Sequence, residues 1–142
     1  MLPLLLMSAL TQAREPDRIH GFRIGSCVGF STECIAANIK LEYAGKYAGI
    51  NLSIPGIPAW GAASLRVYPI PVRERPSMSW RPYGYGGVSM IIMAVGFVGG
   101  GVGADLHLTP SRRLCLQPSA GVMTDHTAAV YPSAALGAMY TF

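Results

Sequence analysis

The chain has 142 residues, of which 51% are hydrophobic and only 13% are charged, so it has one domain's length and about half the charge usual in a soluble domain. Its 17 glycines and 11 prolines disfavour long helices. The formal charge of +4 comes from scattered basic residues without interleaved aromatic residues, which argues against nucleic-acid binding.

The chain begins with a short apolar run, MLPLLLMSALTQA, which ends in Thr11-Gln12-Ala13 and is followed by polar residues. An apolar run with such an ending is typical of a secretory signal peptide. No Lys or Arg precedes the run, so an ordinary buried element is the alternative interpretation. We expect a signal peptide over residues 1–13 and one exported domain over residues 14–142.

Residues 21–30, GFRIGSCVGF, alternate apolar and small or polar side chains and predict the first strand. Cys27 and Cys34 are symmetric about Phe30-Ser31, so a tight hairpin centred there would place them on facing strands, within reach of a disulfide in an oxidising compartment. Three separate buried thiols, with Cys115 as the third, are the other interpretation. The cysteines lack the paired spacing of a metal site.

Similar alternation predicts three further strands in the first half of the chain. Gly45-Lys46 predicts a two-residue turn between the first two of these segments, and prolines mark a loop after the next one. The predicted strands are 36–45, 47–55 and 62–70.

The second half of the chain predicts four more strands, at 81–92, 101–109, 113–122 and 131–142. A turn is expected at Pro110-Ser111.

The region between the fifth and sixth predicted strands allows a second interpretation. Residues 86–104 carry no charge and are long enough for a transmembrane helix. Each of the several glycines there would cost about 1 kcal/mol in a helix interior, and Gly99-Gly100-Gly101 is typical of a turn. We therefore predict two strands joined by an external loop at residues 94–100.

The alternation assigns polar and apolar side chains to opposite faces of each strand. In a membrane barrel the apolar face contacts lipid, and an interior enclosed by eight strands is just wide enough to be filled by side chains. The same alternation fits a sheet with one wet face, so a soluble calycin-like barrel with its apolar face inward is an alternative. The residues predicted to form a polar network inside a membrane barrel are Arg23, Lys40, Glu42, Arg66, Asp105 and His107.

The fourth segment gives a specific test of this assignment. Arg66 is predicted inside the barrel, neutralised by Glu42 or Asp105, because an unpaired buried charge costs several kcal/mol. Leu65 and Val67 then face lipid. The last strand is predicted to pair antiparallel with the first, which leaves no sheet edge exposed in hydrocarbon.

The stretch LGAMYTF places Gly137, Tyr140 and Phe142 at the spacing of the signal that the barrel-assembly machinery recognises in outer-membrane proteins. With the eight alternating segments, the chain from about residue 14 resembles the small eight-stranded outer-membrane barrels of the OmpX, OmpW and OmpA transmembrane-domain type. The resemblance implies an all-β, closed, antiparallel up-and-down transmembrane barrel in a Gram-negative outer membrane. It implies a monomer without cofactor, whose partners are the assembly machinery, membrane lipid and lipopolysaccharide.

The histidines are the obvious catalytic candidates. His20 is expected in solvent before the first strand, and His107 is expected beside Asp105 as an interior polar pair. His126 lies beside Asp125 and near Ser133, and a base, an acid and a hydroxyl are the groups that acyl transfer requires.

The position of His126 is similar to that of the active site in the lipid A 3-O-deacylase family. The chain has His126-Thr127-Ala128-Ala129 where that family has His-x-Ser-Asn, so the serine is missing. The leading expectation is therefore a non-enzymatic barrel with a structural, adhesive or small-solute or lipid-contacting role and no wide pore. A lipid A acyl hydrolase that uses His126 is the alternative.

Overall fold

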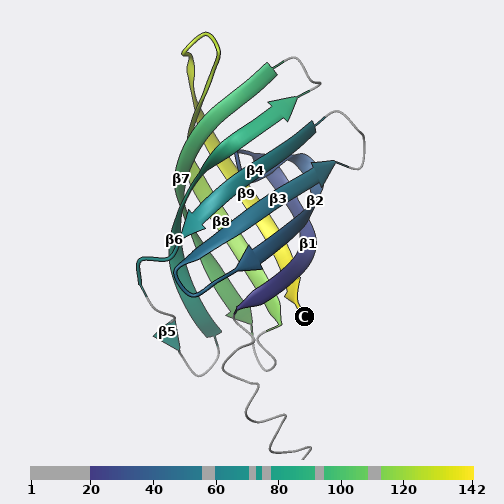
Figure 1. The fold of residues 1–142 in the computed structure, drawn as a ribbon, viewed down its shortest axis with the longest axis vertical. Helices are drawn as coiled ribbons and strands as arrows, with labels where there is room; N and C mark the ends of the chain where they lie inside the picture. Colours follow the sequence, from purple (N-terminus) through teal and green to yellow (C-terminus); the bar gives the residue numbers. More distant parts are fainter. Residues whose placement is uncertain (1–19, 56–59, 71–72, 75–77, 92–94, 109–112) are drawn as a thin grey trace, which may run out of the picture.

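The computed structural model describes residues 20–55, 60–70, 73–74, 78–91, 95–108 and 113–142 (Figure 1). The predicted signal peptide and the turn at Pro110-Ser111 lie outside these residues. The strands are β1 (Gly21–Phe30), β2 (Ile35–Ala44), β3 (Ala48–Pro55), β4 (Trp60–Val67), β5 (Arg73–Glu74), β6 (Met78–Ile91), β7 (Val95–Leu108), β8 (Leu114–Asp125) and β9 (Val130–Thr141).

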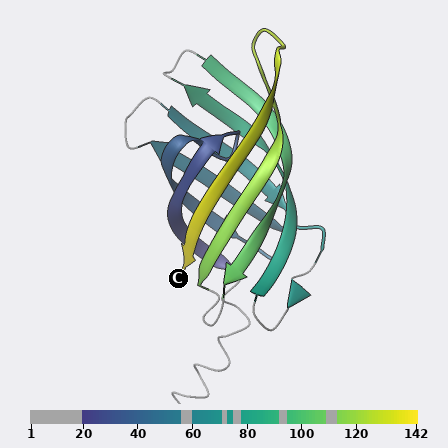
Figure 2. The same ribbon diagram turned by 180° about the vertical axis from the view of Figure 1, so that it is seen from behind.

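The eight long strands close into an antiparallel up-and-down barrel. Each of them pairs with its neighbours in the sequence, β4 pairs with β6, and β9 returns to pair with β1, with Arg23 opposite Thr141 (Figure 2). The two-residue β5 pairs with Trp80 and Ser79 of β6, beyond the point where β4 has ended. The predicted all-β, closed, antiparallel up-and-down barrel of eight strands and the predicted pairing of the last strand with the first are confirmed.

Glycines allow β6 and β7 to run as long strands where the sequence suggested a loop or a helix. Residues 95–100, expected in a loop, belong to β7, so that expectation is wrong. A Cβ atom on Gly99 would lie 2.3 Å from the carbonyl oxygen of Val122, so only glycine permits β7 and β8 to approach this closely. Among the described residues, no helix is long and apolar enough to cross a membrane.

The connection between β2 and β3 also differs from its prediction. It spans residues 45–47 instead of two residues, and the amide of Gly45 donates a 2.9 Å hydrogen bond to the carbonyl of Ala48. One extra residue in the turn shifts the start of β3 without changing which side chains face inward, because alternation resumes at Ala48.

The barrel is polar inside and apolar outside. On β4, Leu65 and Val67 are 65% and 60% exposed, whereas Arg66 between them has no exposed surface. The predicted orientation of this strand is therefore confirmed. Apolar side chains of the other long strands, such as Phe22, Ile50 and Val102, are exposed on the same outer surface.

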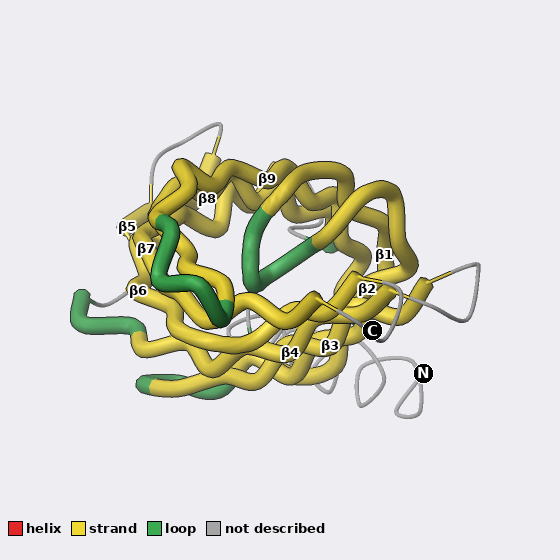
Figure 3. Tube along the Cα trace, turned by 90° about the horizontal axis from the view of Figure 1, so that it is seen from above, coloured by secondary structure: helices red, strands yellow, loops and turns green. Residues whose placement is uncertain are grey.

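The connection from β1 to β2 folds into the barrel instead of away from it. Residues Ser31–Cys34 form this inward loop, and each is at most 1% exposed. Figure 3, a view down the barrel, shows a loop segment that enters the ring of strands beside β1 and β2. The chain leaves the loop through Ala36, whose φ of 58° lies in the left-handed region that costs a non-glycine residue roughly 1 kcal/mol.

Candidate functional site

The interior of the barrel holds an unusually dense set of charges. Alternation along the strands directs these side chains inward, and in the described residues four basic and three acidic side chains are fully buried. All six residues predicted for the interior network are among the buried residues. The buried charged side chains are Arg23, Lys40, Arg66, Arg81, Glu33, Glu42 and Asp105.

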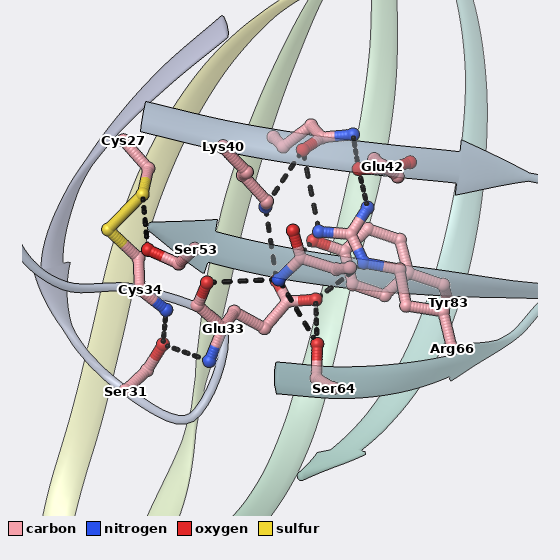
Figure 4. Close-up of polar contacts among 12 residues, drawn as sticks. Cys27, Ser31, Glu33, Cys34, Lys40, Glu42, Ser53, Ser64, Arg66 and Tyr83 are labelled. Carbon is pink, nitrogen blue, oxygen red and sulfur yellow. Dashed lines mark hydrogen bonds and ion pairs between the residues drawn. A yellow bond between two sulfur atoms is a disulfide. The ribbon is translucent and has the colours of Figure 1, made fainter. Parts of the chain in front are cut away.

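Arg66 of β4 lies at the centre of this network (Figure 4). Its Nη1 donates to Glu42 Oε2 at 2.9 Å and lies 3.5 Å from Asp105 Oδ1, and its Nε donates to Glu33 Oε1. The guanidinium carbon is also 4.1 Å from the centre of the Tyr83 ring. The predicted neutralisation of Arg66 by Glu42 or Asp105 therefore occurs through both carboxylates, together with a third that the sequence did not suggest.

Arg23 of β1 forms a second centre with the same carboxylates. Its Nη1 donates to Glu42 Oε1 and to Asp105 Oδ2, both at 2.8 Å. Gln117 of β8 completes the connection, because its Nε2 donates to Glu42 at 2.9 Å and to Asp105 at 3.0 Å. Its Oε1 accepts a 3.0 Å hydrogen bond from Lys40. Charges of both signs are thus linked across the barrel, which offsets much of the cost of removing them from water.

Arg81 of β6 lies at the end of the barrel where β1 begins and β9 ends, which we call the terminal end. Its guanidinium carbon is 3.5 Å from the centre of the Tyr68 ring, and Nη1 donates to the carbonyl of Gly45 at 3.0 Å. The ring of His20 lies 3.4 Å from the same Nη1. His20, expected simply in solvent, therefore contacts the interior network and is only partly exposed.

The inward loop contributes the third buried carboxylate. Glu33 Oε2 accepts a 3.0 Å hydrogen bond from Tyr83, and the Ser31 hydroxyl accepts hydrogen bonds from the amides of Glu33 and Cys34 at 3.0 and 3.2 Å. Cys34 forms a disulfide with Cys27 of β1, with the Cα atoms 6.2 Å apart (Figure 4).

The geometry behind this disulfide differs from the predicted one. Cys27 is paired with Asn38, not with Cys34, because the β1–β2 ladder runs up to Phe30 and Ile35 and leaves Cys34 in the loop. The two cysteines meet inside the barrel because the loop turns inward, and they do not sit on facing strands. Cys115 is a separate buried thiol.

The opposite end, which we call the far end, has an apolar interior. Ile35, Phe97 and Met123 pack together there, and Tyr131 contacts this group, with its ring centre 5.9 Å from that of Phe97. This cluster lies beside the inward loop, since Ile35 follows Cys34 directly. The polar network, the inward loop and the apolar cluster therefore all lie inside the barrel.

The residues of the hydrolase alternative do not come together. His126 is exposed at the β8–β9 turn, whereas Ser133 is buried with its side chain inward on β9. The carboxylate of Asp125 accepts hydrogen bonds from the hydroxyl of Thr127 at 2.6 Å and from that of Tyr131 at 3.0 Å. In the described part of the chain, no hydrogen bond links His126 to Asp125 or Ser133, so nothing orients it as a base.

One group of potential metal ligands lies within the network. Ligand atoms of Asp105, His107 and Cys115 lie within 4.8 Å of one another, and all three residues are buried. The donor types suit zinc, but Arg23 and Arg81 already supply positive charge to Asp105, at 2.8 and 3.4 Å. A cation would be repelled by these guanidinium groups, so the predicted pair of Asp105 and His107 is best described as part of the ion-pair network.

The residues of the predicted assembly signal lie at the terminal end of β9. Gly137 faces inward, where a Cβ atom would lie 3.3 Å from Gln117 Oε1, while Tyr140 and Phe142 face outward with their ring centres 5.7 Å apart. Across the β1–β2 ladder, Phe22 and Tyr43 make a similar outward pair at 5.2 Å. These four residues form an aromatic rim along the three neighbouring strands β2, β1 and β9 at this end.

Sequence reasoning missed four members of the site: Glu33, Arg81, Tyr83 and Gln117. Gln117 follows Leu116 in the predicted strand 113–122, so alternation along that strand was enough to place it on the inner face. Arg81 and Tyr83 lie in the predicted strand 81–92, where RPYGYGG does not alternate apolar and polar residues clearly, and Glu33 lies in the connection between the first two predicted strands, which has no periodic pattern. Comparisons of the chain with protein-family models, with curated proteins and with solved structures found no match.

Proposed function

We propose that this protein is a small outer-membrane β-barrel of a Gram-negative envelope, with a structural, adhesive or lipid-contacting role and no wide pore. The observation that carries the proposal is the contrast on β4 between buried Arg66 and exposed Leu65 and Val67, repeated around the barrel. In water, this arrangement would expose apolar surface and bury charge, both of which are unfavourable. In a bilayer the outer apolar side chains contact lipid, and the charged side chains are kept away from lipid inside the barrel.

The aromatic rim at the terminal end supports this placement. Tyr and Trp side chains are enriched where a membrane meets water, and aromatic girdles flank the apolar band of outer-membrane barrels. Near this rim, Arg113 donates a 3.0 Å hydrogen bond to the hydroxyl of Tyr140, and Lys46 lies 5.2 Å from the centre of the Tyr47 ring. Basic and aromatic side chains together suit a layer of anionic lipid headgroups.

The filled interior supports the absence of a wide pore. Eight strands enclose little space, and the ion-pair network and the inward loop occupy it. The protein would thus act through its outer surface and its ends. In this proposal Gly137, Tyr140 and Phe142 form the signal for insertion, and the barrel-assembly machinery and membrane lipid are the partners.

The test is expression with its natural leader, followed by membrane fractionation and by comparison of boiled and unboiled samples on gels. The proposal predicts recovery in the outer membrane and a compact unboiled form, because closed barrels resist detergent until heated. Vesicles that contain the protein should remain impermeable to sugars. Folded protein in the aqueous periplasmic fraction would contradict the membrane proposal, and sugar entry would contradict the absence of a wide pore; the calycin-like alternative, with its apolar face inward, is already excluded by the outward position of Leu65 and Val67.

A further inference from the structure

The carboxylate of Glu33 is held as a bound ligand would be. Oε1 accepts hydrogen bonds from Arg66 Nε and, at 3.4 Å, from the hydroxyl of Ser64. Oε2 accepts one from the hydroxyl of Tyr83 at 3.0 Å and lies 3.9 Å from Lys40 Nζ. Two charged and two neutral donors thus converge on both oxygens, which is the geometry of carboxylate recognition.

The groups that donate to the Glu33 carboxylate lie on barrel strands, whereas Glu33 itself lies in a loop. Lys40, Ser64, Arg66 and Tyr83 project from the paired strands β2, β4 and β6, so their positions are set by the barrel wall. Glu33 belongs to a four-residue loop. Without Glu33, the buried charges of the described interior would be four basic and two acidic groups, so the site would attract an anion.

The disulfide ties this loop to the inner face of β1. The side chain of Cys27 points into the barrel, so its bond to Cys34 holds the residue next to Glu33 inside as well. Besides the disulfide and the contacts of the Glu33 carboxylate, the loop is held by two hydrogen bonds: Asn51 Nδ2 donates to the Glu33 carbonyl at 3.0 Å, and the Thr32 hydroxyl donates to the Gly99 carbonyl at 3.4 Å. The disulfide is the one covalent link in the described structure between this loop and the inner face of β1, so its reduction removes a restraint on the residue next to Glu33.

We propose that Arg66, Lys40 and Tyr83 form a carboxylate-binding site that Glu33 occupies as a tethered internal ligand, and that reduction of the Cys27–Cys34 disulfide lets a small monocarboxylate compete for it. Reduction by a dithiol transfers two electrons and two protons to the cysteines, which become thiols, while the dithiol becomes a cyclic disulfide. The inference goes beyond the proposed function and concerns the interior whichever phase surrounds the barrel.

The site itself is tested with Glu33→Ala and sodium formate. The variant should unfold at a lower temperature than the natural protein, and formate at about ten times its dissociation constant should raise that temperature by about 3–5 °C. Acetamide is the neutral control for solvent effects, and sodium chloride the control for ionic strength. Thr32→Ala, a change in the same loop that removes no charge, should show no response to formate.

Two outcomes would overturn the site: no response of Glu33→Ala to formate, or an equal response to acetamide. If Glu33→Ala does not fold in sodium chloride, its refolding yield in sodium formate is compared with its refolding yield in acetamide. A higher yield in formate supports the site, and equal yields overturn it. Adding Arg66→Gln to Glu33→Ala should abolish the response to formate.

The tether is tested on the natural protein and on Cys27→Ser/Cys34→Ser. With the disulfide intact, formate should leave the unfolding temperature unchanged. After treatment with a dithiol, and in the double serine variant without any reductant, formate should raise it. Failure of both to respond while Glu33→Ala does respond would overturn the role of the disulfide and keep the site.

Discussion

Neighbouring residues of β4 illustrate how differently the two faces of the barrel are stabilised. Arg66 has no exposed surface and is stabilised by three carboxylates, whereas Leu65 is 65% exposed and contacts whatever surrounds the barrel. On the inner face, specific hydrogen bonds compensate for lost hydration, so each partner matters. On the outer face, only general apolar character is required. The four predictions below test this difference, from the largest expected effect on folding to the smallest.

Removing the central cation should have the largest effect. Arg66→Met leaves Glu33 and Glu42 buried with fewer donors, and breaking a buried ion pair costs about 3–5 kcal/mol. The urea midpoint for unfolding of lipid-refolded protein measures the loss. Leu65→Met, a similar change on the outer face, is the matched control and should cost under about 1.5 kcal/mol. Equal midpoints for the two variants would contradict the central role of Arg66.

A charge on the outer face should have the next largest effect, and only in a bilayer. Leu65→Arg should cost about 2–4 kcal/mol if this residue lies near the bilayer midplane. Arg66→Lys, which keeps the inner charge but loses its forked geometry, should be milder. Unfolding is compared in phospholipid vesicles and in detergent micelles. If Leu65→Arg lowers the free energy of unfolding by the same small amount in vesicles and in micelles, Leu65 does not face hydrocarbon.

The aromatic rim should matter little for folding and much for insertion in cells. Phe142→Ala removes one outward ring, a change on the order of 0.5 kcal/mol. If Gly137, Tyr140 and Phe142 act as the proposed assembly signal, the outer-membrane yield of this variant should fall sharply while refolding into detergent stays normal. Leu136→Ala, an outward change on the same strand, is the control. Equal losses in cells and in detergent would limit Phe142 to packing.

The carboxylate of Asp125, at the β8–β9 turn, belongs neither to the interior network nor to the outer apolar surface. Hydrogen bonds from Thr127, first from its hydroxyl and then from its amide, and from Tyr131 lower the pKa of Asp125 to about 2. Because this pKa lies below the ordinary value of about 3.9, the ionised carboxylate stabilises the turn above about pH 4. That contribution disappears as the pH falls from about 4 through 2.

Amide hydrogen exchange at Thr127 and Ala129 measures this change. Exchange, corrected for its intrinsic pH dependence, should become less protected below about pH 4 in the natural protein. Asp125→Asn should show no such step. Protection that stays constant down to pH 2 would mean that the carboxylate does not hold the turn. The barrel strands should be unaffected, because the turn is exposed.

Strand alternation by itself determined which face most side chains take, outside the glycine-rich region of β6 and β7. The inner position of Arg66 and the outer position of Leu65 followed from a two-residue period, which the backbone imposes along any extended strand. The pairing of β9 with β1 followed from the cost of an open sheet edge in hydrocarbon. The period also predicted that charges of both signs would meet inside. Glycines were less informative, because a glycine that permits close approach of two strands and one that forms a turn have the same sequence signature.

Only the tertiary structure decided the direction of the β1–β2 loop and hence the role of Glu33. A hairpin loop has no periodic pattern, so the sequence does not distinguish a loop that enters the barrel from one that leaves it. Its inward path depends on Arg66 and Tyr83, which are distant in sequence and bind the carboxylate, and on the nearby Cys27, whose side chain already points inward. The ion-pair partners of a buried charge are likewise set by which strands face one another across the closed barrel, because closure joins residues that no local pattern relates.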